Sequence, residues 1–327
     1  MTDTIRWGVA ATGGIAEQFV TGIAQLDDGA EVVAVASRTA ERAEAFGARH
    51  GISRRHPSYE ALAADPDVDG VYVASPHARH EPDTMLFLGT GKAVLCEKPF
   101  ALSHAQAQRM VDLARTLGLF CMEAIWSRFL PAYVTLRGVL AEGRIGTPLV
   151  VEADFGFRRP VEPHHRLFDL TLGGGALLDL GIYPLQLASM VLGTPDDVAA
   201  VAHLGETGVD EQVAAVLHHP DGGLAAVKAA IRVPLACTAR ISGTDGWIDL
   251  PAFMHTPLHL DVTDPRGHER LERPYQGEGL RFEAAEVHRC LRAGLTESPV
   301  MPLDETLTLA ATLDAVRERI GLVYPGT

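Results

Sequence analysis

The chain has 327 residues, of which 47% are hydrophobic and 21% are charged, and its formal net charge is −14. This length favours two domains, and an acidic balance without a run of Lys and Arg argues against a nucleic-acid partner, because phosphate binding needs clustered basic side chains. The N-terminus lacks a signal-peptide pattern, no apolar run reaches the ~18 residues of a membrane span, and the four cysteines form no CxxC pair. We therefore expect a cytoplasmic protein with reduced thiols and no membrane segment.

Apolar runs and amphipathic segments alternate over the first third of the chain. The apolar runs predict strands at 4–11, 31–37, 68–75, 92–99 and 119–124. Helical spacing predicts helices between them, at 16–26, 39–51, 81–91 and 103–118. Such alternation implies parallel strands joined by right-handed crossovers. The predicted fold is α/β, and its first domain, residues 1–124, is a Rossmann-type doubly wound sheet.

The first carboxyl end of this sheet carries Ala11-Thr12-Gly13-Gly14-Ile15-Ala16, which reads A-x-G-x-x-A against the dinucleotide fingerprint G-x-G-x-x-G. Gly13 lets the backbone approach a pyrophosphate, and the helix that begins there offers free N–H groups. We predict that the cofactor contacts Ala11, Thr12, Gly13, Gly14 and Ile15. The alternative is a structural turn.

Ser37-Arg38 stands at the end of the second strand, where an NAD-binding chain often has an acid for the ribose hydroxyls. Ser37 can hydrogen-bond a 2′-phosphate, and Arg38 can pair with it and stack on adenine. Arg42 follows one turn later. This pattern predicts NADP in preference to NAD, with a solvated Arg38 at the start of a helix as the alternative.

Two segments at the next strand ends resemble those of a known family. CEKPF, Cys96–Phe100, resembles the E-K-P signature of the Gfo/Idh/MocA oxidoreductases, and SPHARH, Ser75–His80, resembles the family's preceding loop with His77 in place of asparagine. The resemblance implies that Lys98 reaches the nicotinamide and the substrate hydroxyl. It also implies that the cofactor lies against Ser75, Pro76, His77, His80 and Glu97. A surface ion pair of Lys98 with Glu97 and a structural role for His80 are the alternatives, and we expect no metal site.

GGGALLDLGIYPLQ, from Gly173 to Gln186, resembles the family's second signature. Asp179 and Tyr183 are four residues apart, so they share a face of a helix. Tyrosine at the second position marks a subgroup with dimeric dihydrodiol dehydrogenases, D-xylose 1-dehydrogenases and glucose–fructose oxidoreductase. The dihydrodiol dehydrogenase resemblance extends over essentially the whole chain, including ETGVDE at 206–211 and ESPVMPLDET at 297–306. It makes Asp179 and Tyr183 site residues, with a core hydrogen bond as the alternative.

Aromatic residues near these motifs are the candidates for the substrate side. Trp126, Arg128 and Phe129 lie in EAIWSRFLPAY, and Phe155 lies in the strand that follows. The alternative for the first three is packing between domains, and Phe155 reads equally as sheet surface or pocket wall.

The second domain, residues 125–327, is predicted to be α+β. Strands are expected at 149–157, 197–205, 211–220, 224–234, 237–250 and 258–265, with hairpin turns at PDGG and GTDG. This implies a large, mostly antiparallel sheet for substrate binding, and the resemblance implies a homodimer through its open face.

These residues predict hydride transfer between a CH–OH group and NADP⁺. Tyr183 is the acid/base, Lys98 lowers its pKa, and Asp179 orients the substrate or the lysine. The expected substrate is an aldose or a cyclic trans-diol, and a sugar is favoured. The alternatives are a non-catalytic NADP sensor and a glucose–fructose oxidoreductase-like enzyme that keeps its cofactor bound.

Overall fold

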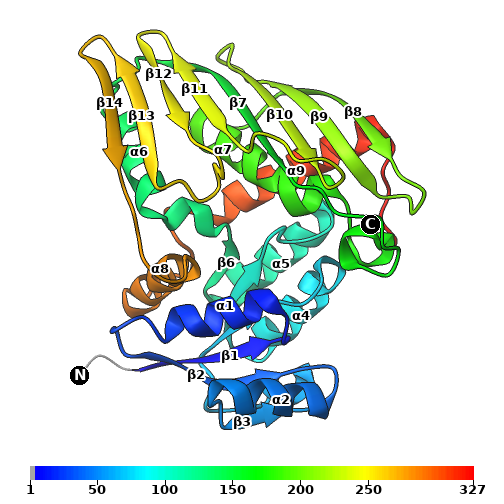
Figure 1. Ribbon diagram of the computed structural model, residues 1–327. Helices are drawn as coiled ribbons and strands as arrows, with labels where there is room; N and C mark the ends of the chain where they lie inside the picture. Colours follow the sequence, from blue (N-terminus) through cyan, green and yellow to red (C-terminus); the bar gives the residue numbers. More distant parts are fainter. Residues whose placement is uncertain (1–3) are drawn as a thin grey trace. The chain divides into compact units, whose positions relative to one another are not determined.

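The computed structural model describes residues 4–327, which form two compact units (Figure 1). The first unit holds the described residues up to 101 together with 105–129 and 276–306, and the second holds 102–104, 130–275 and 307–327. The predicted boundary between residues 124 and 125 assigns 276–306 to the second domain, whereas the contacts group this segment with the first unit. Local sequence patterns do not reveal that residues 276–306, far along the chain, pack against the N-terminal residues.

The first unit contains a parallel sheet of six strands in the order β3-β2-β1-β4-β5-β6. The strands are β1 (Ile5–Ala10), β2 (Ala30–Ala36), β3 (Arg54–His56), β4 (Gly70–Val73), β5 (Ala93–Glu97) and β6 (Cys121–Ala124). Helices α1 (Gly14–Ile23), α2 (Ala40–His50), α3 (Tyr59–Ala63), α4 (His80–Gly89) and α5 (His104–Leu117) connect them. The sequence predicted five of these strands and missed β3 and α3, because the three residues of β3, Arg-Arg-His, carry no apolar pattern.

Aromatic packing in the core of the first unit explains why 276–306 belongs to it. Trp7 of β1 meets Phe19 of α1 edge to face at 5.3 Å, and Phe19 stacks on Tyr72 of β4 at 3.9 Å. The indole N–H of Trp7 donates to His288 at 2.8 Å. This buried bond ties α8 (Leu280–Arg292) to β1.

The second unit is built on an eight-stranded sheet, whose order β14-β13-β12-β11-β7-β10-β9-β8 can be followed across Figure 1. The strands are β7 (Pro148–Gly156), β8 (Asp197–Leu204), β9 (Asp210–His218), β10 (Leu224–Ala230), β11 (Ala239–Gly243), β12 (Gly246–Leu250), β13 (His259–Asp264) and β14 (Gly267–Glu272). Only the β10–β7 pair is parallel among these neighbours. The predicted fold class is confirmed, and β14 is a strand that the sequence did not predict.

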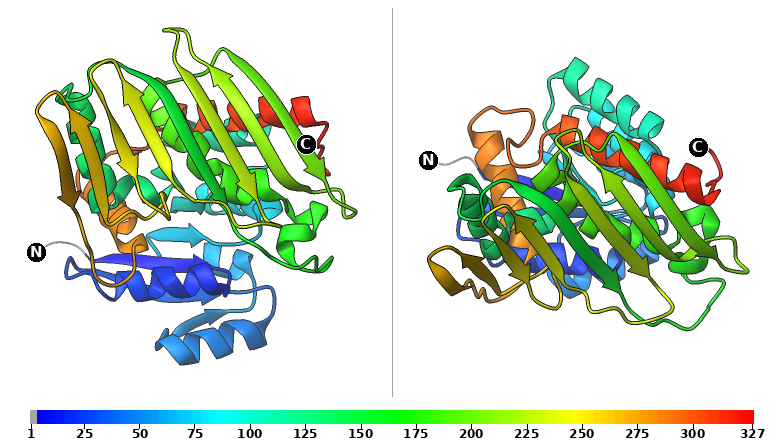
Figure 2. Two further views of the ribbon diagram at one scale, coloured as in Figure 1. Left: turned by 45° about the horizontal axis from the view of Figure 1, so that its top comes forward. Right: turned by 90° about the horizontal axis from the view of Figure 1, so that it is seen from above.

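Helices α7 (Ile182–Leu192) and α9 (Leu303–Ile320) lie on one side of the eight strands (Figure 2), and α6 (Pro131–Ala141) completes the helices of the second unit. Alternate strand residues such as Val213, Ala215 and Val227 are buried on this side. Val201 and Val216 point to the other side and remain 73% and 50% exposed. The sheet therefore has one covered face and one open face.

The stretch Leu170–Leu192 is long and apolar enough to cross a membrane, with a mean hydropathy of 1.4. However, 83% of its most apolar window is buried inside the fold. It is the core helix of the second unit rather than a membrane span. Cys96, Cys121, Cys237 and Cys290 are all free and buried.

Candidate active site

The turn between β1 and α1 has the geometry of a phosphate-binding turn. Gly13 precedes the helix in an extended conformation, and Glu17 N–H is bonded to Gly13 O, so the N–H groups of residues 14–16 lie at the helix start. Apart from the adjoining residues and the backbone of the helix itself, no atom of residues 4–327 lies within 4 Å of a Cβ placed on Gly13 or Gly14. The space beside these glycines fits a dinucleotide, whose pyrophosphate the helix N-terminus would hold.

Ala11 stands at the first glycine position of the fingerprint and has a φ of 108°. Its N–H donates to Ala36 O at 3.0 Å, which holds the turn against β2. Positive φ costs an L-residue roughly 1–2 kcal/mol. The turn therefore keeps its shape in spite of the alanine.

Two neighbouring hydroxyls lie at the end of β2, and two arginines follow at the start of α2. Ser37 is buried, and its Oγ lies 3.5 Å from Oγ1 of Thr12. Arg38 and Arg42 are exposed at the start of α2, where Oγ1 of Thr39 caps the helix by accepting from Arg42 N–H. Residues 37–40 contain no acid, and their hydroxyl and guanidinium groups are hydrogen-bond donors.

The loop after β4 is locked to the turn after β5. The ring nitrogens of His80 lie 2.7 Å from Pro99 O and 2.9 Å from Ser75 O, and His80 is fully buried. Ser75 Oγ donates to Asp83 Oδ2 at 2.6 Å. These contacts support the structural role that was the alternative for His80. His77, which follows Pro76 in a 3-10 turn, lies edge-on to His80 at 5.6 Å.

Two buried carboxyls hold the turn that carries Lys98. Glu97 Oε2 accepts from the backbone N–H of Lys98 at 3.2 Å, and Glu97 Oε1 accepts from the hydroxyl of Tyr72. Glu123 at the end of β6 accepts from Phe100 N–H at 2.9 Å, and burial raises the pKa of Glu123 to about 7. The Lys98–Pro99 peptide bond is cis. Hydrogen bonds therefore fix the backbone at Lys98, which lies at the carboxyl edge of the sheet. Ligands of doubly wound sheets bind at this edge.

A 3-10 turn, Trp126–Phe129, carries three of the predicted substrate residues. Arg128 is buried, and its guanidinium bonds to Glu305 Oε1 at 2.6 Å and to Val300 O at 3.4 Å. These partners support a packing role for Arg128. Trp126 is half-buried and Phe129 is buried.

In the second unit, the glycine run ends in a crowded turn that only glycine can make. Gly175 has a φ of 121°, and a Cβ on Gly174 would lie 2.6 Å from Arg166 O. A π-helical turn, Leu177–Gly181, follows and leads into α7. Asp179 lies in the π turn and Tyr183 in the first turn of α7, so the predicted regular α-helical spacing is interrupted between them. Single π turns in helices are frequent at functional sites.

Asp179 and Tyr183 are both buried, and each has a partner that the sequence analysis missed. Arg166 bonds to the Asp179 carboxylate at 2.7 and 3.4 Å. His255, from the loop after β12, stacks on Phe155 at 4.3 Å and lies 5.0 Å from the Tyr183 ring. Phe155 and Tyr183 meet edge to face at 5.5 Å. The basic run His164-His165-Arg166 was a signal for Arg166, whereas nothing in the pattern around His255 pointed to a site.

The structure therefore brings the predicted residues together in two groups. The first unit gathers the cofactor candidates with Lys98 at the carboxyl edge of its sheet, and the second gathers Phe155, Asp179 and Tyr183. Residues 4–327 contain no group of three or more His, Cys, Asp or Glu that could hold a metal ion.

The first of these groups marks a dinucleotide-binding protein, and comparison with known proteins identifies its family. Residues 5–125 match the model of the oxidoreductase family with an NAD-binding Rossmann fold, and residues 133–249 match that of the GFO/IDH/MocA C-terminal domain. The chain is 42% identical to trans-1,2-dihydrobenzene-1,2-diol dehydrogenase of Bos taurus and 40% identical to that of Homo sapiens. Both matches cover 98% of each chain.

Two solved structures share the complete fold. An aldose-aldose oxidoreductase from Caulobacter crescentus superposes with a TM-score of 0.87 at 25% identity, covering 97% of both chains. The 3-ketoreductase KijD10 from Actinomadura kijaniata, in complex with NADP and TDP-benzene, gives 0.85 at 28% identity over 97% of this chain and 98% of its own. The chain belongs to the Gfo/Idh/MocA family of NAD(P)-dependent oxidoreductases. The predicted family and enzyme class are confirmed.

Proposed function

We propose that the protein is an NADP-dependent dehydrogenase that oxidises a secondary CH–OH group, with a cyclic trans-dihydrodiol as the first candidate substrate. The observation that carries this proposal is the contact of Tyr183 with Phe155 and His255. The stacked rings of Phe155 and His255 lie beside this candidate acid/base, and aromatic rings suit the face of an unsaturated six-membered ring. The relatives with 42% identity are named for such a substrate.

A sugar is the second candidate, although the sequence analysis favoured it. Aromatic rings also stack on the apolar face of a sugar, and the similar Caulobacter crescentus structure is an aldose-aldose oxidoreductase. The higher identity of the dihydrodiol dehydrogenases, over the whole chain, moves the diol to first place.

In the proposed mechanism, Tyr183 takes the proton of the substrate hydroxyl. A bound nicotinamide supplies the hydride acceptor. A free phenol has a pKa near ~10, too high for a base at neutral pH, and an ammonium group placed beside it would lower that pKa. Asp179, held by Arg166, orients the substrate through its carboxylate.

The proposed preference for NADP rests on Ser37, Arg38 and Arg42. Ser37 stands at the end of β2, and the two arginines stand at the start of α2. The end of the second strand is where a dinucleotide fold holds the adenine ribose, and a hydroxyl with guanidinium groups there suits a 2′-phosphate. The KijD10 structures contain NADP, which supports the same preference.

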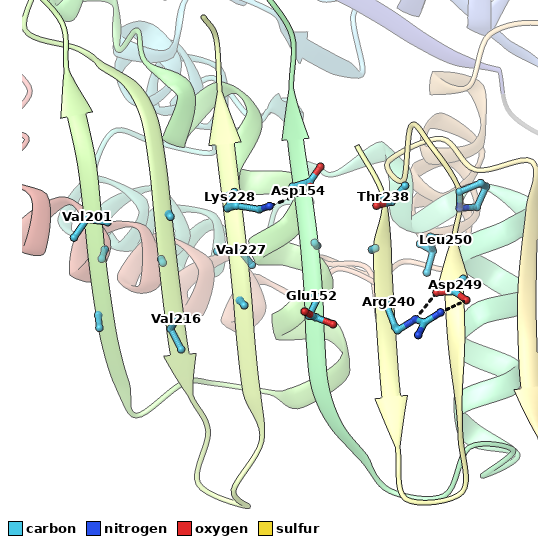
Figure 3. Close-up of a pocket in the computed structure, with 18 residues that line it drawn as sticks. Glu152, Asp154, Val201, Val216, Val227, Lys228, Thr238, Arg240, Asp249 and Leu250 are labelled. Carbon is cyan, nitrogen blue, oxygen red and sulfur yellow. Dashed lines mark hydrogen bonds and ion pairs between the residues drawn. The ribbon is translucent and has the colours of Figure 1, made fainter. Parts of the chain in front are cut away.

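We also propose that two copies of the chain pair through the open face of the eight-stranded sheet. This face has a hollow of about 990 Å³. Figure 3 shows the side chains that line it. Its β8–β9 part is apolar, with Ala199, Val201 and Val216, whereas strands β10, β7, β11 and β12 carry the ion pairs Lys228–Asp154 at 3.5 Å and Arg240–Asp249 at 2.6 Å. An exposed apolar patch bordered by charges is typical of a protein interface.

The pairing is tested by the mass in solution. A dimer has twice the 35.0 kDa of one chain. We expect Val216→Asp to give the mass of one chain. Val161→Asp, at an exposed valine on a loop, should leave the dimer intact.

We also propose that the protein is cytoplasmic, because all four of its cysteines are free thiols.

Reduced-nicotinamide absorbance tests the proposed reaction. The protein is mixed with NADP⁺ or NAD⁺ and with a trans-dihydrodiol, pentoses or hexoses, and we expect the strongest signal with NADP⁺ and the diol. Tyr183→Phe should lower turnover by about 10²–10⁴-fold, the usual contribution of a general base, while NADP binding measured by fluorescence persists. Full turnover by Tyr183→Phe would exclude Tyr183 as the acid/base, and a signal with an aldose alone would make the sugar the substrate.

A further inference from the structure

Asp210 is a buried acid that the proposed mechanism does not use. It is the first residue of β9 and belongs to the segment ETGVDE, and its side chain is fully buried. Its Oδ2 accepts from the backbone N–H of Leu177 at 2.6 Å. Leu177 is the first residue of the π turn that carries Asp179.

The glycine turn is shaped around this carboxyl. A Cβ on Gly175 would lie 2.0 Å from Asp210 Oδ1 and 3.2 Å from the hydroxyl of Tyr324. That hydroxyl donates to Gly174 O at 2.7 Å. One carboxyl and one phenol therefore hold both sides of the turn that leads into the helix with Asp179 and Tyr183.

Burying this acid is costly, so its presence needs a reason. Burial raises the pKa of Asp210 to about 7, and hydrogen bonds from the N–H groups of Ala176 and Leu177 oppose the shift. Burial raises the pKa of Tyr324 and Asp210 adds to the rise, while the guanidinium of Arg317, 5.4 Å from the ring centroid, opposes it. A neutral residue would avoid the cost of desolvating the carboxylate. What a carboxyl offers at the start of a helix is a strong acceptor for free N–H groups.

We propose that Asp210 is a positioning residue, whose bond to Leu177 N–H sets the place of Asp179 and Tyr183 in the active site. This inference rests on the roles proposed above for those two residues. Leu177 is two residues from Asp179 and six from Tyr183, so a shift of the first turn moves both side chains. Misplacement of a catalytic group by about 1 Å can cost 10²-fold in rate.

The test compares Asp210→Asn and Asp210→Ala with Asp264→Asn in the full-length protein. Asp264 is a matched control, because it is a buried aspartate of the same unit that accepts a backbone N–H, from Arg266 at 2.8 Å. Asparagine keeps an acceptor for Leu177 N–H but bonds more weakly than a carboxylate. We expect Asp210→Asn to lower kcat about threefold and Asp210→Ala at least tenfold, with the KM for NADP⁺ unchanged. Asp264→Asn should lower Tm and leave kcat unchanged.

Hydrogen exchange gives a second readout that does not depend on turnover. We expect faster amide exchange at residues 176–183 in Asp210→Asn, and no change there in Asp264→Asn. Unchanged kcat and exchange in Asp210→Asn would overturn the proposal, as would a loss of kcat that Asp264→Asn matches at equal loss of Tm. If Asp210→Ala does not fold, Asp210→Asn alone decides.

Failure of the proposed function gives a different result. If Tyr183→Phe retains turnover while Asp210→Asn loosens residues 176–183, Asp210 still holds the helix but the acid/base lies elsewhere. If Tyr183→Phe is inactive and Asp210→Asn behaves as wild type, the acid/base stands and the positioning role of Asp210 is overturned.

Discussion

Glu123 in the first unit and Asp210 in the second are both buried carboxyls, and each accepts a backbone N–H two residues away from a predicted catalytic side chain. Glu123 binds Phe100 N–H beside Lys98, and Asp210 binds Leu177 N–H beside Asp179. Burial raises the pKa of each to about 7. Both units thus hold a candidate catalytic residue by the same means.

The settings of the two carboxyls differ. Glu123 lies at the end of a parallel strand, with Arg128 and Thr306 opposing the rise in its pKa, and the Lys98 turn has a further carboxyl, Glu97, bonded to it. Asp210 has only backbone N–H groups that oppose the rise, and the turn it supports consists of glycines. The edge of a sheet is held by its neighbouring strands, whereas a glycine turn relies on a few specific contacts. We therefore expect substitutions around the glycine turn of the second unit to lower activity and stability more than substitutions around the Lys98 turn.

Gly175→Ala is the strongest way to break the contact between Asp210 and the glycine turn. The new Cβ would lie 2.0 Å from Asp210 Oδ1 at a φ of 121°, so we expect a loss of about 4 kcal/mol in unfolding free energy, measured by denaturant titration. Gly208→Ala is the matched control. Gly208 also has a positive φ, 84°, but its nearest atom would be 3.6 Å away, so its cost should be about 1 kcal/mol. Equal losses in the two variants would mean that the Asp210 contact has no energetic weight.

The two buried carboxyls should each make stability fall as the pH rises. Because each folded-state pKa is about 7, against ordinary values of 3.8 for Asp and 4.5 for Glu, the folded protein binds more protons than the unfolded chain between these values. Each protonated carboxyl makes its full contribution to the unfolding free energy below about pH 4. That contribution, on the order of 3 kcal/mol per group, is lost as the pH rises from about 4 to 7. Glu123→Gln and Asp210→Asn should each flatten this slope, as seen in denaturant titrations across that range. If only one variant does so, only that carboxyl titrates as described.

Arg38→Ala tests the first unit alone. Loss of a guanidinium that pairs with a 2′-phosphate should raise the KM for NADP⁺ at least tenfold, about 1.4 kcal/mol, and leave the KM for NAD⁺ nearly unchanged. Arg49→Ala, at the far end of the same helix where Arg49 lies near Glu17, should change neither constant. Equal effects of Arg38→Ala on both cofactors would contradict the NADP assignment.

Ala11→Gly tests how much strain the β1–α1 turn of the first unit carries, compared with the glycine turn of the second unit. The first unit has an alanine at a φ of 108°, where the second has Gly175 at 121°. Glycine at position 11 removes the strain, so we expect a gain of about 1 kcal/mol in unfolding free energy and equal or tighter NADP binding. Ala10→Gly, in the regular strand one residue earlier, should instead cost about 0.5–1 kcal/mol. A loss of stability in Ala11→Gly would show that the alanine side chain contributes packing greater than the strain.

The sequence was sufficient for most of the architecture. Strands such as Ile5–Ala10 and Ala93–Glu97 are mainly apolar and the helices between them are periodic, so hydrophobic pattern predicted the doubly wound sheet. The hairpins at PDGG and GTDG were predicted by turn chemistry. It did not predict β3, whose three residues are polar, or the return of 276–306 to the first unit, which depends on the bond from Trp7 to His288.

For the candidate site, the sequence by itself selected the residues that are proposed to carry the chemistry, and the tertiary structure decided which groups hold them. Lys98, Asp179 and Tyr183 stand in short motifs, so the sequence of their immediate neighbours was enough to select them. The roles of Arg166, Asp210, His255 and Glu123 come from contacts between segments far apart in the chain, which no local pattern records. The physical reason is that periodicity reports which face of an element is buried, whereas a buried carboxyl or imidazole is defined by the particular N–H group or ring that folding places against it.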